Sequence, residues 1–319
     1  MNNHSFGKGV FFVTTAYIIW GFLPVYWRIL AVFSPTHLLG FRILFSLLFV
    51  SLALLKIKNF KWLKFYKDKQ TRYYMILASL TVSFNWGLYI WAVNNGRTIE
   101  AALGYYINPL ISIIFGLYFF KEKLKVLQII AVCFAFIGVT VLTIFTGRFP
   151  WISLSLAIAF AIYSVLKKKV KLSALESLGA ETLIAAPIAM TLLLASFGTE
   201  HGIQFTGFQG LSYILDLHII ILFLLLLSGP ATSLPLYLFT IGTKILPFST
   251  IGFIQFISPT FAFFTGLFIF KESFPARNFI AIGFIWVAVI LYIISLRASP
   301  KLRASTKLRA SPKLKPSVK

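Results

Sequence analysis

Acidic residues are scarce in this chain. Only 8 Asp and Glu stand against 30 Lys and Arg among 319 residues, and the four charged types together make up 12% of the sequence. A water-soluble protein of this length could not cover its surface with so few charges. The shortage of charge excludes a soluble globular domain and indicates a chain embedded in a membrane.

Other absences narrow the class of protein further. A single cysteine, Cys133, excludes an intrachain disulfide. The sequence contains no HExxH, no phosphate-cradling GxxxxGK[ST] and no Cys/His cluster with metal-ligand spacing. We therefore expect no enzymatic activity, no cofactor and no metal. Without an ATP site, any uphill transport would have to run on an ion gradient or on substrate exchange.

The apolar residues form long blocks. They make up 59% of the chain, which has a mean hydropathy of +0.88. A hydrocarbon core of about 30 Å takes roughly 20 helical residues to cross, and these blocks lack the alternation of barrel strands. Ten blocks are long enough: 10–31, 38–55, 74–94, 101–120, 126–146, 150–166, 174–197, 217–241, 248–270 and 278–296. We predict an all-α polytopic membrane protein with ten transmembrane helices; the first block is too long for a secretion signal.

The net charge of +22 indicates how the chain is oriented in the membrane. If the N-terminus is cytoplasmic, 24 of the 30 Lys and Arg fall on the cytoplasmic face. This bias follows the positive-inside rule and predicts a multi-pass inner (plasma) membrane protein with both termini in the cytoplasm. Nucleic-acid binding is not expected.

The basic tail, 297–319, repeats a hexapeptide three times as RASPKL, RASTKL and RASPKL. Its composition predicts disorder. Weak adsorption to anionic lipid head groups and no role at all both stay open. Beyond the bilayer and a small-molecule substrate the sequence indicates no partner; it leaves the oligomeric state open, and a monomer is compatible with it.

One apolar run occurs twice. GYYINPLISIIFGLYFFKE (104–122) and IQFISPTFAFFTGLFIFKE (254–272) agree at seven of nineteen positions. Further pairs match Tyr89 with Tyr237 and Arg42 with Glu181. The chain therefore reads as two five-helix units, 8–147 and 148–296. Since five is odd, the second unit must be inverted, which is an architecture of alternating-access carriers.

Pro109 and Pro259 occupy matching places near the middle of their spans. Each removes a backbone donor, and helices interrupted at matching positions point to a substrate site near the midplane. The alternative is a simple packing kink. The Lys-Glu pair that ends each run is interpreted as a marker of the span end rather than as chemistry.

Two charges stand out because they lie inside spans, where charge is expensive. Arg42 lies roughly 10 Å below one face and Glu181 roughly 12 Å below the other, at 1.5 Å per helical residue. We expect them to flank a central cavity, with Arg42 attracting anionic groups and Glu181 attracting cations or protons. The alternative is a static ion pair between them.

Amide and phenol groups could hold the polar end of a substrate while aromatic rings enclose its apolar body. The alternative for each amide is a hydrogen bond between helices. The neutral candidates are Trp20, Asn85, Trp86, Tyr89, Tyr106, Asn108, Tyr163, Tyr237 and Gln255, beside Pro109 and Pro259.

Several strings carry a family resemblance: NWGLYIWAVNNG (85–96), EAALGYYINPLISIIFG (100–116), SLPLYLF (233–239) and IGFIQFISPTFAF (251–263). They resemble the RarD-type members of the EamA group, within the drug/metabolite transporter superfamily. The resemblance covers about residues 8–296 and excludes the basic tail. It implies ten helices in two inverted five-helix units. It also implies secondary transport of small metabolites or drugs; a chloramphenicol-sensitivity label common in the subgroup defines no substrate.

We thus expect a secondary transporter of a small metabolite or drug, with amino-acid-like and aromatic compounds among the candidates. Alternating access is the expected mechanism. A non-transporting receptor or scaffold that modulates drug sensitivity, or a channel, is the alternative.

Overall fold

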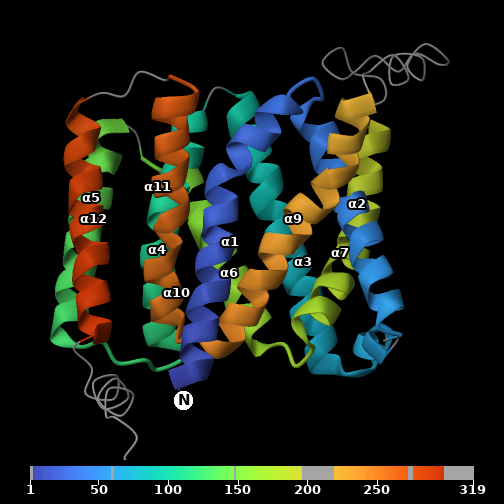
Figure 1. The fold of residues 1–319 in the computed structure, drawn as a ribbon, viewed down its shortest axis with the longest axis horizontal. Coiled ribbons are helices and arrows are strands. Elements are labelled where there is room, and N and C mark those ends of the chain that lie inside the picture. Colours follow the sequence, from blue (N-terminus) through green and yellow to red (C-terminus); the bar gives the residue numbers. More distant parts are fainter. Residues whose placement is uncertain are drawn as a thin grey trace, which may run out of the picture.

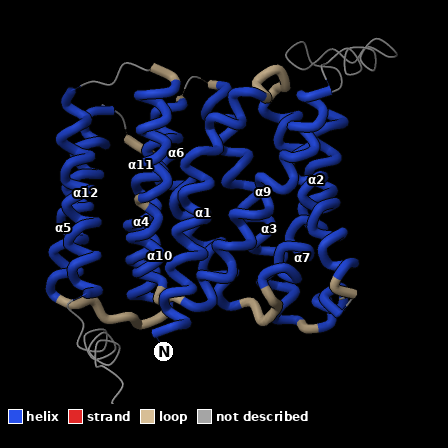
Figure 2. Tube along the Cα trace, viewed as in Figure 1, coloured by secondary structure: helices blue, strands red, loops and turns tan. Residues whose placement is uncertain are grey.

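The structure is a computed structural model that describes residues 3–58, 61–95, 97–146, 149–195, 219–271 and 276–297. Within these ranges it is helical and contains no strand (Figure 2). Ten helical segments are long and apolar enough to cross a membrane. The predicted all-α fold with ten spans is confirmed. The tail predicted to be disordered lies outside the described residues from position 298 on.

The helices run as a bundle with their axes roughly along one direction (Figure 1). In chain order they are α1 (Asn3–Ile29), α2 (Pro35–Lys56), η1 (Lys61–Lys67), α3 (Lys69–Asn94), α4 (Thr98–Phe119), α5 (Val126–Thr146), α6 (Trp151–Lys169), α7 (Ala174–Ala195), α9 (Ile219–Ile245), α10 (Phe248–Gln255), α11 (Ile257–Phe264), η2 (Thr265–Ile269) and α12 (Ala276–Arg297).

The two prolines of the repeated run act differently. In the second half the span is divided into α10, α11 and the π-helical η2, with a break at Phe256, three residues before Pro259. In the first half α4 continues as one helix with Pro109 inside it. The predicted interruption is therefore wrong for α4. Neighbouring helices can satisfy the backbone groups that a proline frees, so a membrane helix can continue through it.

Helices distant in the sequence pack side by side. α5 packs on α12, α4 on α6 and α10, and α1 on α9 and α11. α2 packs on α7 and α9, while α3 packs on α6 and α7. Each of these contacts joins one of spans one to five with one of spans six to ten. The region between α2, α3, α7 and α9 is therefore built from both halves.

Large apolar side chains cover the outside of the bundle. On α5, for example, Val126, Phe136 and Ile144 are exposed, while Ala131 and Ala135 face α12 and are buried. Such an apolar exterior suits contact with lipid tails rather than with water. The fold is that of a multi-pass membrane protein.

The start of α1 and the end of α12 lie at the same end of the bundle. Gly9 on α1 lies against Leu246, which follows α9. Near the last turn of α12, the Tyr292 hydroxyl donates to Thr250 Oγ1 at 2.8 Å, close to the start of α10. The N-terminus is marked at this end in Figure 1.

Lys121 and Lys271, the lysines of the two repeated Lys-Glu motifs, lie at opposite ends of the bundle. Lys121 precedes Glu122, which contacts the start of α10. Lys271 follows Phe270, whose ring lies 4.4 Å from the Arg28 guanidinium at the other end of α1. Both lysines adopt the left-handed backbone conformation, with φ of 51° and 54°. The duplicated sequence thus ends its helices with the same backbone turn.

Candidate functional site

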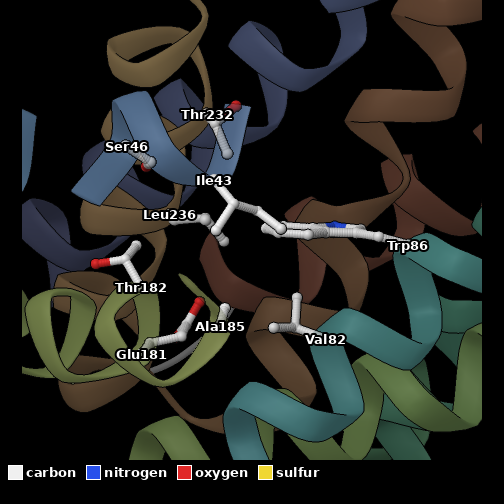
Figure 3. A pocket seen from close by; sticks show the side chains of 9 residues that line it. All are labelled: Ile43, Ser46, Val82, Trp86, Glu181, Thr182, Ala185, Thr232 and Leu236. Atoms are coloured by element: carbon white, nitrogen blue, oxygen red, sulfur yellow. The ribbon is translucent and has the colours of Figure 1, made fainter. Parts of the chain in front are cut away.

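A narrow pocket lies between α2, α3, α7 and α9 (Figure 3). Its walls consist of Ile43, Ser46, Val82, Trp86, Glu181, Thr182, Ala185, Thr232 and Leu236. It has room for about one water molecule, whereas sites for drug-sized ligands are about 300–1,000 Å³. A drug-sized ligand therefore does not fit into the pocket in this structure. Across the described ranges, no group of three or more His, Cys, Asp or Glu could hold a metal.

Glu181 on one wall belongs to a buried ion pair. Its Oε2 lies 2.7 Å from Lys167 Nζ, and both side chains are almost fully buried. The Tyr163 hydroxyl donates to the same carboxylate, at 3.1 Å from Oε2. Buried charges persist only when they are paired and hydrogen-bonded, and this cluster meets both conditions.

Lys167 is the functional candidate that the sequence interpretation missed. The predicted span 150–166 ends one residue before Lys167, which places this lysine among the basic residues of the cytoplasmic face. Instead α6 continues to Lys169, and Lys167 faces inward. The signal was the helical period: Tyr163 and Lys167 are four residues apart and share one face. An inward Tyr163 therefore requires an inward Lys167.

Arg42 lies on the other side of the pocket and does not pair with Glu181. Its Nε donates to Thr232 Oγ1 at 3.1 Å. Its guanidinium carbon lies 4.2 Å from the Trp27 ring centre and 5.5 Å from that of Trp86. Since Thr232 and Trp86 also line the pocket, Arg42 and Glu181 flank it from two sides. The alternative, a static ion pair between Arg42 and Glu181, is not formed in this structure because Glu181 pairs with Lys167.

Trp20 and Tyr237 belong to an aromatic core beside the ion pair. The Trp20 ring packs against Tyr17, Phe160 and Phe239 at centre distances of 5.0, 6.0 and 5.6 Å. Tyr237 packs against the same core, which includes the buried Tyr163. These rings support the Glu181 cluster from behind rather than line the pocket.

A second group of predicted residues meets where α4 crosses α10 and α11. The Tyr106 hydroxyl donates to the Pro259 carbonyl at 3.2 Å. The Pro109 carbonyl faces Gly252, where an added Cβ would lie only 2.8 Å from it. Pro109 thus lies against α10 and Tyr106 against Pro259 on α11, at close contacts between the halves and outside the pocket walls.

Asn108 and Gln255 are buried beside the two prolines. Among the described residues no hydrogen-bond partner reaches Asn108 Oδ1 or either amide atom of Gln255. Gln255 approaches the Tyr17 hydroxyl without reaching hydrogen-bond geometry.

Asn85 and Tyr89 contact residues outside the pocket, unlike Trp86. The Asn85 amide donates to the Leu156 carbonyl on α6 at 2.8 Å, which is the interhelical bond that the sequence left open as the alternative. The Tyr89 ring packs against Tyr105 at 5.9 Å. Of these three predicted residues, Trp86 alone is part of the pocket wall.

Polar contacts close the end of the bundle at which α1 begins. Lys168 Nζ donates to the carbonyls of Thr243 and Leu246, at 2.7 and 2.5 Å. Lys244 Nζ donates in return to the carbonyls of Val170 and Leu172. Each lysine thus caps the C-terminal end of the helix that carries the other, α9 and α6.

Glu122 closes the same end across the two halves. Its carboxylate accepts hydrogen bonds from the backbone N–H groups of Phe248 and Ser249, at 2.5 and 2.8 Å. A carboxylate at a helix N-terminus is stabilised by the unpaired N–H groups and by the helix dipole. We call Glu122, Lys168 and Lys244 the latch. Its counterpart in the repeat, Glu272, lies outside the described residues.

The bundle of apolar spans, with a small pocket between helices of its two halves, belongs to the class of polytopic membrane transporters. Residues 7–144 match the model of the EamA-like transporter family. The chain is 37% identical to the "Uncharacterized transporter YojE" of Bacillus subtilis, over 90% of this chain and 94% of that protein. It is 36% identical to "Protein RarD" of Streptomyces exfoliatus, over 89% of this chain and 87% of that protein.

The chain belongs to the EamA-like transporter family, as a RarD-type member of the drug/metabolite transporter superfamily. One crystal structure aligns with a TM-score of 0.68 at 16% identity and covers 91% of this chain and 98% of the other. At that identity the likeness concerns the fold alone. The resemblance noted in the sequence is confirmed.

Proposed function

We propose that the protein is a secondary carrier that moves a small amphipathic metabolite or drug across the plasma membrane by alternating access. The observation that carries this proposal is the central pocket. It is lined from both halves of the chain, is flanked by one charge of each sign, and is closed in this form. A carrier needs such an occluded site between two moving halves, whereas a receptor or scaffold does not.

Two inverted repeats, 8–147 and 148–296, would supply the moving halves. The packing of the helices supports this division: α4 contacts α6 as α11 contacts α1, and α3 contacts α7 as α9 contacts α2. The matching left-handed turns at Lys121 and Lys271, at opposite ends of the bundle, support the inversion. Exchange of conformation between equivalent halves would then open the pocket first to one side and then to the other.

The orientation follows from the lysines. The latch end also carries the first turn of α1 and the basic residues around 121–125 and 167–171, so we place it in the cytoplasm. The latch and the Lys167–Glu181 pair then lie between the cytoplasm and the pocket, while the partly exposed Arg42 lies toward the outside. This form is closed inward. The basic tail would lie at the cytoplasmic lipid surface.

Glu181 is the proposed proton-coupling residue. It is the acidic side chain at the pocket wall, and its charge is balanced by Lys167 with Tyr163 as a further donor. Protonation of Glu181 would release Lys167, and a buried unpaired lysine strongly favours rearrangement. Proton binding could in this way drive the opening of the inward side.

Counterflow into proteoliposomes tests the transport function. Vesicles preloaded with unlabelled members of a metabolite panel, chloramphenicol included, receive the labelled compound outside. We expect saturable uptake that is accelerated by internal substrate. Flux that does not saturate would indicate a channel, and no flux for any compound would favour a receptor or scaffold.

The inversion predicts that residues 121 and 271 face opposite sides of the membrane. Lys121→Cys and Lys271→Cys, each with Cys133→Ser, are to be labelled with a membrane-impermeant maleimide in right-side-out and inside-out vesicles. Both positions are exposed at the ends of their spans. We expect Lys121→Cys to react from the cytoplasmic side and Lys271→Cys from the outside. Labelling of both from one side would rule out inverted repeats.

A further inference from the structure

Arg42 is a charge within a span that has no acidic partner among the described residues. The two ion pairs found there are Lys167–Glu181 and Arg97–Glu100. Within the described part of the chain, the Arg42 side chain donates one hydrogen bond, from Nε to Thr232 Oγ1. A cation inside a membrane span is costly and is usually held for a function. The partner of this one is therefore to be sought outside the described chain.

The surroundings of Arg42 hold its guanidinium in one orientation. The Trp27 and Trp86 rings lie 4.2 and 5.5 Å from it and stabilise its charge through cation–π contacts. Because Thr232 occupies Nε, the two terminal nitrogens keep the planar fork that matches a carboxylate. Arg42 is partly exposed, which leaves a route for an incoming group to these nitrogens.

On this geometry, we propose that Arg42 binds the carboxylate of a monoanionic organic substrate whose apolar body lies on the neighbouring rings. The inference rests on the transport function proposed above and names its substrate class. Tyr89 follows Trp86 by three residues on α3, and its ring packs against that of Tyr105 at 5.9 Å. Tyr105 is 49% exposed, so its ring is open to an apolar ligand.

The balance of charge selects a monoanion. Lys167 and Glu181 cancel each other, so the pocket and its flanks carry the single positive charge of Arg42. One carboxylate neutralises it. A phosphate dianion would leave a negative charge uncompensated within the membrane span, and an amine would add a second positive charge beside Arg42.

Binding of three compounds with the same ring tests the inference: 3-phenylpropionate, its neutral amide and 3-phenylpropylamine. Equilibrium dialysis with the purified full-length protein in detergent gives each dissociation constant. We expect the acid to bind about tenfold tighter than the amide in the wild type. In Arg42→Gln the two should bind equally, and Arg42→Lys should retain part of the preference.

Arg28→Gln is the matched control. Arg28 also contacts an aromatic ring, that of Phe270, but it is exposed at the end of α1. This variant should keep the wild-type preference for the acid, and thermal unfolding reports whether each variant is folded. Equal affinities for acid and amide in the wild type, no binding of the acid, or an unchanged preference in Arg42→Gln would overturn the carboxylate site.

Counterflow of the same compounds separates this inference from the transport function. If Arg42→Gln and the wild type exchange neutral, basic and acidic compounds equally, the protein is a carrier and the carboxylate site is wrong. If the acid binds with an Arg42-dependent preference but no compound is exchanged, the site stands and the transport function fails.

Discussion

Glu181→Gln is expected to lower the free energy of unfolding by about 3–5 kcal/mol and to abolish proton-coupled uptake. The substitution leaves the fully buried Lys167 ammonium without its carboxylate, 2.7 Å away in the wild type. An uncompensated charge in the apolar interior is the source of the loss. Unfolding by SDS in mixed micelles measures the stability, and uptake at imposed pH gradients measures the coupling.

The double variant Lys167→Met/Glu181→Leu separates the two effects. Replacing a buried ion pair by apolar side chains of similar size is often neutral or stabilising, so we expect stability near that of the wild type. Proton-coupled uptake should remain absent, because no group is left to carry the proton. Wild-type pH dependence in this variant would exclude the proton role of Glu181.

Glu100→Gln serves as a comparison. Its partner Arg97 lies at the start of α4, with 24% of its side chain exposed. Water and the Trp151 ring, 5.2 Å away, can stabilise Arg97 after the substitution. We therefore expect a smaller loss of stability than for Glu181→Gln. Equal losses would mean that burial of Lys167 is not what makes Glu181 important.

Gly229→Ala is expected to destabilise the protein by about 1–3 kcal/mol and to abolish uptake. An added Cβ would lie 2.4 Å from the backbone carbonyl carbon and oxygen of Phe45. No change of rotamer can relieve a clash with backbone, so α2 and α9 must move apart. Phe45 and Gly229 each lie one turn from a partner in the Arg42–Thr232 hydrogen bond, which would therefore break.

Gly87→Ala is the matched control for this clash. Gly87 lies on α3, and an added Cβ there meets nothing within 4 Å. Since alanine has the higher helix propensity, by about 1 kcal/mol, this variant should be as stable as the wild type or more so. Stability is again measured by SDS unfolding. If Gly229→Ala behaves like Gly87→Ala, the α2–α9 contact is looser than the structure has it.

The sequence alone supports the ten spans, their approximate bounds and the family. Hydropathy is summed along the chain and does not depend on how the helices pack, because the bilayer sets the length of every span. The recurrence of the run at 104–122 is likewise visible without any structure. Glu181 could also be singled out beforehand, since a charge within a span is rare for energetic reasons.

Pairing of the charges was decided by tertiary structure. Which lysine neutralises Glu181 depends on the exact end of α6 and on the rotation of α6 against α7. A predicted span that ends at residue 166 leaves Lys167 outside the membrane and so does not indicate this pair. The partner of Glu122 lies 126 residues away at the start of α10. Sequence offers no local signal for a carboxylate that caps a helix of the other half.

The same reason explains why the predicted site was only partly brought together. Arg42, Trp86 and Glu181 flank or line the pocket, whereas Tyr106, Pro109 and Pro259 lie where α4 packs on α10 and α11. The composition of the sequence determined that these side chains lie within membrane spans. Which of them come together was decided only by how the helices cross. Contacts between spans depend on packing geometry that no single span encodes.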